Sequence, residues 1–178
     1  MNIFIIGPGG VGKSTSGRIL ADILQYKFID LDKEFCKEIG DITAYIPAQG
    51  YKNYCEENSK LFYRLLEENT EDTIFVLSSG FLVHENLDKL TTKHKRTIKK
   101  GLSILLLPSE SKGKSTEIVV ERQLSRGFGL NEERERQKFR KRFDIYKKFG
   151  NIKIFSTDMP ENIAKEMEEK VAKFHKKT

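Results

Sequence analysis

Five short runs of apolar residues are distributed along the chain, separated by segments that carry apolar residues at helical spacing. The runs span Asn2–Ile6, Lys27–Ile29, Thr73–Leu77, Ser103–Leu107 and Ile152–Phe155. The third (TIFVL) and fourth (SILLL) are rich in apolar residues and do not alternate with polar ones. Such runs are typical of parallel strands that are buried on both faces of a sheet.

The segments between these runs have the apolar periodicity of amphipathic helices. It is clearest in Ser14–Gln25, in Gly50–Glu68 and in a last segment that begins at about Pro160. Strands that alternate with helices predict an α/β fold with a central parallel sheet of about five strands, covered by helices on both faces. With no internal repeat and no linker, we expect a single domain over residues 1–178.

The composition restricts the class of protein. Hydrophobic residues make up 38% of the 178 residues, enough for a packed core. No apolar run is long enough to span a bilayer, and the first residues lack the basic start of an export signal, so we expect a cytoplasmic protein without membrane contact. The two cysteines, Cys36 and Cys55, lack the spacing of a zinc site.

A glycine-rich segment, GPGGVGKS, follows the first apolar run and precedes the first helical segment. It fits the P-loop pattern, in which backbone N–H groups surround phosphate oxygens and glycines avoid side-chain clashes. Lys13 is expected on the terminal phosphates of ATP, and the Ser14 hydroxyl on Mg²⁺. The predicted ATP-binding residues here are Gly9, Gly10, Val11, Gly12, Lys13, Ser14 and Thr15.

The same glycines also fit the dinucleotide-binding pattern G-x-G-x-x-G, through Gly7, Gly9 and Gly12. The lysine and the hydroxyl residues that follow Gly12 distinguish the two possibilities. A site for a triphosphate and Mg²⁺ requires them, whereas a dinucleotide site does not. We therefore favour the triphosphate site.

Two aspartates, Asp30 and Asp32, follow the second apolar run directly. The chain lacks the N-K-x-D pattern of GTPases, and the third and fourth runs are not followed by an aspartate. Because the carboxyl ends of parallel strands share one edge of a sheet, the two carboxylates should face the P-loop. One could serve Mg²⁺ and the other an acceptor hydroxyl; alternatively, Asp32 caps the helical stretch that follows it.

The order of these motifs resembles that of the shikimate kinases. The specific part is GPGGVGKSTSGRILADILQYKFIDLDKEF, which ends at Phe35, and a looser match continues through nearly the whole chain. The resemblance implies the fold of the nucleoside monophosphate kinases, a three-layer P-loop fold with a mobile lid. It implies that Asp32 contacts the acceptor hydroxyl, that Asp30 lies near Mg²⁺, that Gly80 belongs to a substrate-binding loop and that Arg142 binds a substrate carboxylate.

The acceptor half departs from the pattern of that family. Cys55 stands where the family has an arginine that holds the substrate carboxylate, and a thiol cannot replace a bidentate guanidinium. The three glycines of the substrate-binding loop appear as Ser79-Gly80-Phe81, which adds side-chain bulk. The ATP half is thus matched better than the acceptor half, so that either another hydroxyl compound is the acceptor or the shikimate pocket is rebuilt.

Glycines flank Arg126 in the segment Ser125-Arg126-Gly127-Phe128-Gly129, after a predicted helix. They fit a loop that changes conformation, and an arginine on such a loop can reach the transferring phosphoryl group. We expect a lid at about residues 122–142, in which Arg126 is catalytic and binds ATP. Arg122, one turn earlier, is a candidate for stacking on the adenine; a solvated surface turn is the alternative for this segment.

The net charge of +6 favours an anionic partner. We expect this partner to be a small hydroxyl-bearing metabolite rather than a nucleic acid, and the oligomeric state stays open. The motifs together predict an ATP-dependent phosphotransferase that uses Mg²⁺, with Lys13, Asp32 and Arg126 as catalytic residues. The alternative is an ATP-binding regulatory module without kinase activity, which the missing arginine at Cys55 suggests.

Overall fold

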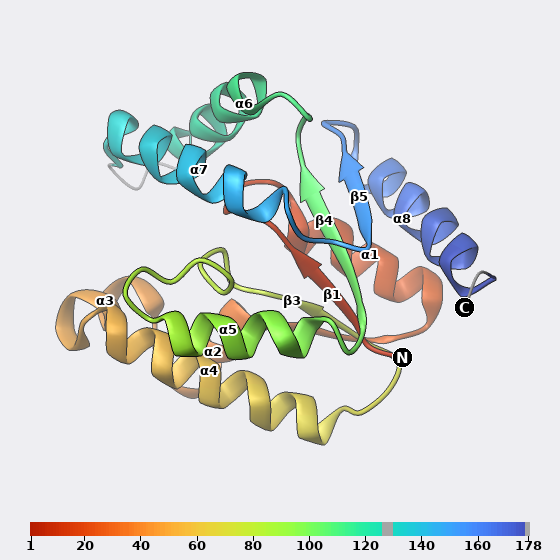
Figure 1. Ribbon diagram of the computed structural model, residues 1–178, viewed down its shortest axis with the longest axis horizontal. Coiled ribbons are helices and arrows are strands. Elements are labelled where there is room, and N and C mark those ends of the chain that lie inside the picture. Colours follow the sequence, from red (N-terminus) through yellow and green to blue (C-terminus); the bar gives the residue numbers. More distant parts are fainter. Residues whose placement is uncertain (126–129, 177–178) are drawn as a thin grey trace.

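The computed structural model describes residues 1–125 and 130–176, and Figure 1 shows a central sheet between layers of helices. The sheet has five parallel strands in the order β2-β3-β1-β4-β5. The strands are β1 (Ile3–Ile6), β2 (Lys27–Asp30), β3 (Thr73–Val76), β4 (Leu102–Leu107) and β5 (Ile152–Phe155). Each agrees with an apolar run of the sequence to within one residue at either end, which confirms the predicted α/β class.

Helices form most of the remaining described chain. They are α1 (Lys13–Leu24), α2 (Leu31–Glu38), α3 (Ile42–Gln49), α4 (Tyr51–Glu68), α5 (Asp88–Ile98), α6 (Lys112–Leu124), α7 (Glu132–Tyr146) and α8 (Pro160–His175). The three segments with the clearest periodicity became α1, α4 and α8. Pro160 starts α8 because a proline at the first helical position loses no hydrogen bond.

The alternation of side chains along β1 explains the three layers. The ring of Phe4 lies 6.2 Å from that of Phe62 on α4, which is one face of the sheet. The neighbouring Ile5 points the opposite way, toward Gly17 on α1, because successive side chains of a strand face opposite sides. A Cβ atom on Gly17 would lie 2.9 Å from the Ile5 side chain, so α1 packs closely only because this residue is glycine.

The carboxyl ends of the strands bring the predicted site segments to one edge of the sheet. The P-loop leaves β1, Asp30 ends β2, and residues 77–87 leave β3 toward α5. Because all strands are parallel, these connections lie at the same edge. In Figure 1, α6 and α7 lie side by side beyond this edge.

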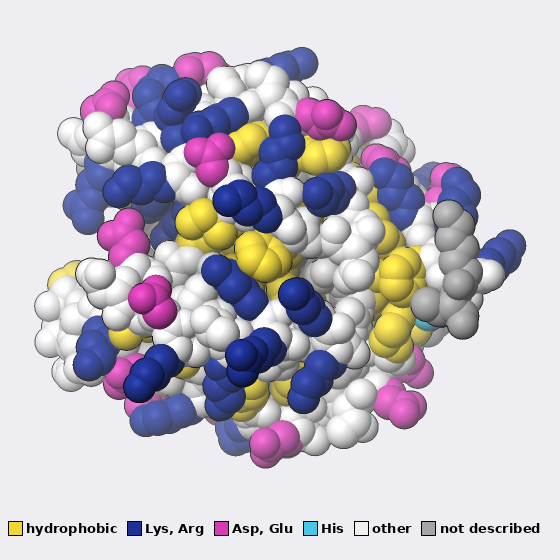
Figure 2. Space-filling model, viewed as in Figure 1, with side chains coloured by type: hydrophobic (Ala, Val, Ile, Leu, Met, Phe, Trp, Pro, Cys, Tyr) yellow, Lys and Arg dark blue, Asp and Glu magenta, His cyan; other side chains and the backbone are white. Residues whose placement is uncertain are grey.

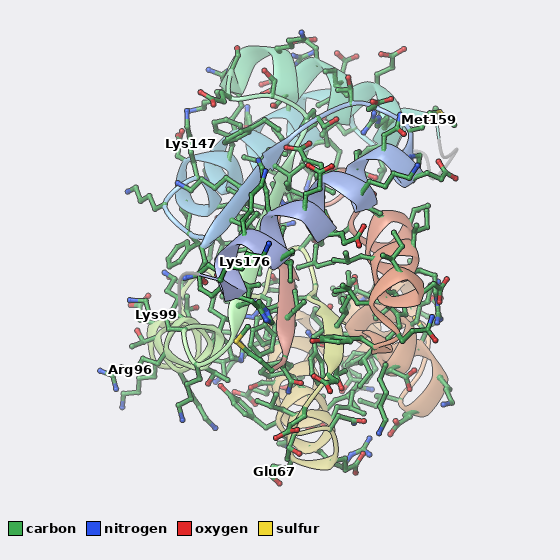
Figure 3. The ribbon with its side chains drawn as sticks, turned by 90° about the vertical axis from the view of Figure 1, so that its right-hand side faces the viewer. Glu67, Arg96, Lys99, Lys147, Met159 and Lys176 are labelled. Carbon is green, nitrogen blue, oxygen red and sulfur yellow. The ribbon has the colours of Figure 1, made fainter. Side chains whose placement is uncertain are left out.

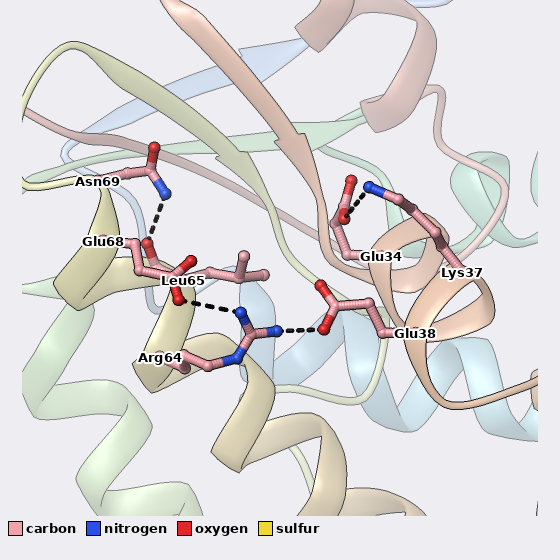
Figure 4. A network of polar contacts seen from close by, with 7 residues as sticks. All are labelled: Glu34, Lys37, Glu38, Arg64, Leu65, Glu68 and Asn69. Atoms are coloured by element: carbon pink, nitrogen blue, oxygen red, sulfur yellow. Dashed lines mark hydrogen bonds and ion pairs between the residues drawn. The ribbon is translucent and has the colours of Figure 1, made fainter.

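An ion-pair network connects α2 with α4, the two helices that carry Asp32 and Cys55. Arg64 on α4 contacts Glu38 at the end of α2 and, at 3.0 Å, Glu68 on its own helix (Figure 4). Exposed pairs of this kind contribute little to stability. They nevertheless show that the end of α2 lies beside α4.

Basic residues dominate the face that Figure 2 shows, and acidic residues lie mostly at its margins. On α5, the Arg96 side chain extends away from the body of the protein, as does that of nearby Lys99 (Figure 3). Both residues belong to the basic segment Lys93–Lys100 (KHKRTIKK), and their exposure is that of a solvated helix face. Among the described residues, no helix combines the length and apolar character that crossing a membrane requires.

Candidate active site

The P-loop starts α1 with an uncapped N-terminus. Gly12, the residue before the helix, has a φ of 95°, and Gly10 has a φ of 78°, both in the left-handed region that favours glycine. No side chain caps the helix, and its first turn contains no acidic residue. The first N–H groups of a helix need partners from outside it, and an anion can provide them.

The Lys13 side chain folds back onto the P-loop and binds its backbone oxygens. Its Nζ donates hydrogen bonds to the backbone oxygens of Gly7 (2.9 Å) and Pro8 (2.8 Å), and the side chain is 8% exposed. Val11 is buried in the core, whereas Ser14 is half-buried and Thr15 is exposed. The glycines of the loop other than Gly7 and the hydroxyl residues Ser14 and Thr15 are therefore accessible to a ligand, and the Lys13 ammonium lies against the backbone oxygens of the loop.

This arrangement fits a triphosphate with Mg²⁺. Glycines with positive φ and an uncapped helix form an anion cradle, and the lysine supplies the compensating charge. Within residues 1–125 and 130–176, no cluster of three His, Cys, Asp or Glu residues could hold a metal by itself. Mg²⁺ in phosphate-binding sites needs only one or two protein oxygens, because phosphates and water complete its shell.

The two aspartates after β2 have different surroundings. Asp30, not Asp32, caps α2: its carboxylate accepts a hydrogen bond from the backbone N–H of Lys33 at 3.4 Å. The alternative that Asp32 is the cap is wrong, because the helix begins one residue earlier, at Leu31. Asp32 thus lies in the first turn, with its carboxylate free of capping.

Asp32 faces the segment that follows β3. Its Oδ1 accepts hydrogen bonds from the Ser78 hydroxyl and, at 3.4 Å, from the Tyr54 hydroxyl of α4. Burial, and then the nearby Asp32 charge, raise the pKa of Tyr54 well above its usual range, so this phenol stays protonated as a donor. The carboxylate is therefore oriented by two neutral hydroxyls, and no cation pairs with it within the described chain.

Residues 79 and 80 connect this carboxylate to α7. Arg142 donates a hydrogen bond to the Ser79 hydroxyl at 3.0 Å, and the hydroxyl of Tyr146 donates to the Ser79 backbone oxygen at 3.1 Å. A Cβ atom on Gly80 would lie 3.5 Å from the Arg142 guanidinium. The structure thus brings Asp32, Gly80 and Arg142, predicted from distant parts of the sequence, to one region.

The bulk expected from Phe81 does not enter this region. Its ring is fully buried and stacks on His94 of α5 at 3.8 Å, nearly parallel. His94 also contacts the Phe81 backbone oxygen, and Ser59 of α4 contacts the other ring nitrogen. The expectation was wrong here because Phe81 points into the core and anchors the loop instead.

Cys55 is fully buried beside His84, a residue that the sequence did not single out. The Cys55 Sγ lies 3.2 Å from the Nδ1 of His84, and the hydroxyl of Tyr51 lies 3.3 Å from the same nitrogen. Burial raises the pKa of the Cys55 thiol to about 11, so it is a neutral thiol at physiological pH. His84 has no motif around it, and only the proximity of the loop to α4 reveals this group.

The nucleotide side is also bordered by α6. The side chain of Gln123 lies close enough that a Cβ on Gly9 would be 3.0 Å from its Nε2. Arg122 is half-buried on the same helix, and Arg126 lies outside the described residues.

A hollow of about 700 Å³ opens at the ends of β4 and β5, between Pro108–Glu110 and Phe155–Asp158.

The fold and this edge define a P-loop protein of the α/β class, with a phosphate cradle beside a second polar region that holds Asp32 and Arg142. A family model described as shikimate kinase matches residues 9–172. The chain therefore belongs to the shikimate kinase family.

Individual relatives agree with this assignment over part of their length. The shikimate kinase of Histophilus somni (strain 2336) is 40% identical over 80 residues, which are 44% of this chain and 43% of that protein. That of Pasteurella multocida (strain Pm70) is 36% identical over 96 residues, 52% of this chain and 53% of that protein. The matched segment thus spans about half of each relative.

The solved structure of the Acinetobacter baumannii shikimate kinase in complex with shikimate resembles the whole fold. The two chains superpose with a TM-score of 0.75, over 97% of this chain and 93% of the other, at 21% sequence identity. At this identity, the likeness establishes the three-layer fold and leaves the acceptor to be determined.

Proposed function

We propose that this protein is an ATP-dependent kinase that transfers the terminal phosphoryl group of ATP to a hydroxyl of a small anionic metabolite. Shikimate is the first acceptor to test, because the family and its curated relatives bear that name. We also propose that the reaction takes place in the cytoplasm, where ATP is available.

The observation that carries the proposal is the position of Asp32. Its carboxylate lies at the sheet edge that holds the P-loop, and it accepts hydrogen bonds from Ser78 and Tyr54 without a cationic partner among the described residues. A carboxylate in this state can accept the proton of an acceptor hydroxyl. General-base assistance of this kind contributes about 10²–10⁴-fold to a rate.

On the donor side, the backbone N–H groups of residues 9–12 and the Lys13 ammonium would bind the phosphates. Ser14 and Asp30 are the residues that would hold Mg²⁺, which would neutralise charge on the phosphate oxygens. Lys13 would have to exchange at least part of its contacts with Gly7 and Pro8 for phosphate oxygens. The roles of Arg122 at the adenine and of Arg126 at the transferring group stay predictions.

On the acceptor side, Arg142 would bind the anionic group of the metabolite. Its guanidinium lies beside Gly80 and lines a hollow of about 670 Å³, which could receive the ligand. An acceptor held between Arg142 and Asp32 would have its anionic group and its reacting hydroxyl at opposite ends. This arrangement suits a hydroxylated carboxylic acid, a class that includes shikimate.

The test is the release of ADP from ATP and Mg²⁺, with and without an acceptor. We expect shikimate to increase ADP release at least 10-fold in the native protein, and we expect Lys13→Ala to abolish the increase. The acceptors should include shikimate, other polyol acids, aminoglycosides and nucleosides. If ATP binds by calorimetry but none of these compounds increases ADP release, the proposed kinase activity is wrong.

A further inference from the structure

Three side chains from different elements meet at Gly80. A Cβ atom on this glycine would lie 2.7 Å from the Tyr51 hydroxyl, 3.5 Å from the Arg142 guanidinium and 3.6 Å from the Nδ1 of His84. Tyr51 begins α4, Arg142 belongs to α7, and His84 lies in the connection between β3 and α5. Gly80 and His84 are buried, whereas Tyr51 is exposed and Arg142 half-buried, so a ligand reaches this group through Tyr51 and Arg142.

Only Arg142 among these three carries a charge at physiological pH. Burial, followed by the charges of His94 and Arg142, lowers the pKa of His84 to about 4. Burial and the nearby Cys55 raise the pKa of Tyr51 to about 12. Tyr51 thus presents a neutral hydroxyl next to the Arg142 cation, and both line a hollow of about 670 Å³. The same hollow is lined by Arg134, Lys138 and Lys141 and by the carboxylates of Glu85 and Asp144, so its charge favours an anion.

The hydrogen bonds of His84 determine whether the Tyr51 hydroxyl can donate a hydrogen bond to a ligand. The Nε2 of His84 is buried and has no hydrogen-bond partner among the described residues, while Nδ1 faces Tyr51 and Cys55. A buried N–H group without an acceptor is rare, so we assign the proton to Nδ1 and the lone pair to Nε2. Nδ1–H then donates toward the Tyr51 oxygen, and the Tyr51 hydroxyl keeps its own proton. That proton faces the Cys55 thiol, a weak acceptor that a carboxylate can displace.

We propose that Tyr51 is a substrate-binding residue, whose hydroxyl donates a hydrogen bond to the same acceptor carboxylate that Arg142 binds. His84 is a positioning residue that fixes the Tyr51 oxygen, and Cys55, which is fully buried, packs against His84 without reaching the ligand. This inference rests on the proposed function. It narrows the acceptor to a hydroxy acid whose carboxylate lies between Arg142 and the Tyr51 hydroxyl.

The test is calorimetric binding of shikimate and of its methyl ester, which lacks the negative charge, to the native protein and to Tyr51→Phe. A hydrogen bond to a charged group is worth about 1.5–3 kcal/mol, so we expect Tyr51→Phe to weaken shikimate binding about 10-fold to 100-fold. The ester should bind weakly to both proteins and differ between them by less than about 3-fold. Tyr63→Phe is the matched control, because Tyr63 lies on the same helix with its hydroxyl on Thr97.

The positioning role of His84 has its own readout. His84→Ala should weaken shikimate binding, whereas His84→Asn, whose amide N–H can replace Nδ1–H, should restore most of it. Unchanged shikimate binding in Tyr51→Phe would overturn the inference, as would an equal loss for shikimate and its ester. Because binding is measured without turnover, a protein that binds shikimate through Tyr51 but releases no ADP would support this inference and contradict the kinase activity.

Discussion

Asp32 is the residue on which the chemistry of the proposal depends most. Asp32→Asn keeps the shape of the side chain and its contacts with Ser78 and Tyr54 while it removes the basic oxygen. We expect the acceptor-dependent rate of ADP release to fall about 10²–10⁴-fold. The dissociation constant of ATP should stay within about 2-fold, because the phosphates are bound by the P-loop.

The matched control for this substitution is Asp22→Asn, at an exposed aspartate on the first helix. It should leave both the rate and ATP binding unchanged. An Asp32→Asn protein with full turnover would show that the carboxylate neither orients nor deprotonates the acceptor.

The sequence predicted residues with chemical motifs well, and residues that act through packing poorly. The P-loop and Asp32 could be predicted because the order of these residues along the chain is characteristic. Gly80 and Arg142 lie in the same region as Asp32, and the roles of all these residues stay predictions. Tyr51 belongs to no motif and lies in a segment that was predicted only to be helical. Its relation to His84 depends on how the segment after β3 folds against α4, which no local pattern encodes.

At the level of the elements, Asp30 has two separable tasks. It caps α2, and we propose that it also holds Mg²⁺. Replacing a capping aspartate by alanine costs about 1 kcal/mol, whereas serine is an equally good cap. We therefore expect Asp30→Ala to lower the free energy of unfolding in urea, and Asp30→Ser to preserve it.

Both variants should require more Mg²⁺ for half-maximal ADP release, because neither retains the carboxylate. A normal Mg²⁺ requirement in Asp30→Ser would assign Asp30 to capping alone. The same pair of measurements thus separates a structural task from a catalytic one at a single residue.

The strands and the main helices followed directly from the hydrophobic pattern, since a strand buried on both faces must be apolar throughout. The first residue of α2 was harder to predict from the sequence. With Asp30 and Asp32 so close together, either could cap a helix, and only the backbone conformation at Asp30 shows that it is the cap. The sequence placed the Phe81 side chain in the substrate-binding region for a similar reason. The direction of this side chain depends on its contact with His94, which is distant in the sequence.

For the whole molecule, two buried histidines predict a loss of stability in mild acid. Burial lowers the pKa of both His84 and His94 to about 4 in the folded protein, compared with about 6.5 in an unfolded chain. Between these values the unfolded chain binds more protons, so the stabilising contribution is complete above about pH 6.5 and is lost as the pH falls toward 4. Between about pH 7 and pH 5 the loss should be on the order of 2 kcal/mol for each histidine.

Urea unfolding between about pH 7 and pH 5 measures this loss before most carboxylates titrate. The two rings face each other at 5.6 Å, so their protonation is coupled. The other groups that face them are Tyr51, Cys55 and Arg142 at His84, and Ser59, Tyr63, Phe81 and Lys93 at His94. His84→Asn combined with His94→Asn should flatten the pH dependence in this range. An equally steep dependence in the double variant would assign the effect to other groups.

Phosphorus NMR of a reaction with ATP, Mg²⁺ and shikimate follows the phosphoryl group itself from ATP to a metabolite hydroxyl. We expect a new phosphomonoester signal that grows in step with ADP, and its absence in Asp32→Asn. ADP that appears together with inorganic phosphate alone, or ATP that is bound and left intact in the presence of every acceptor, would contradict this transfer.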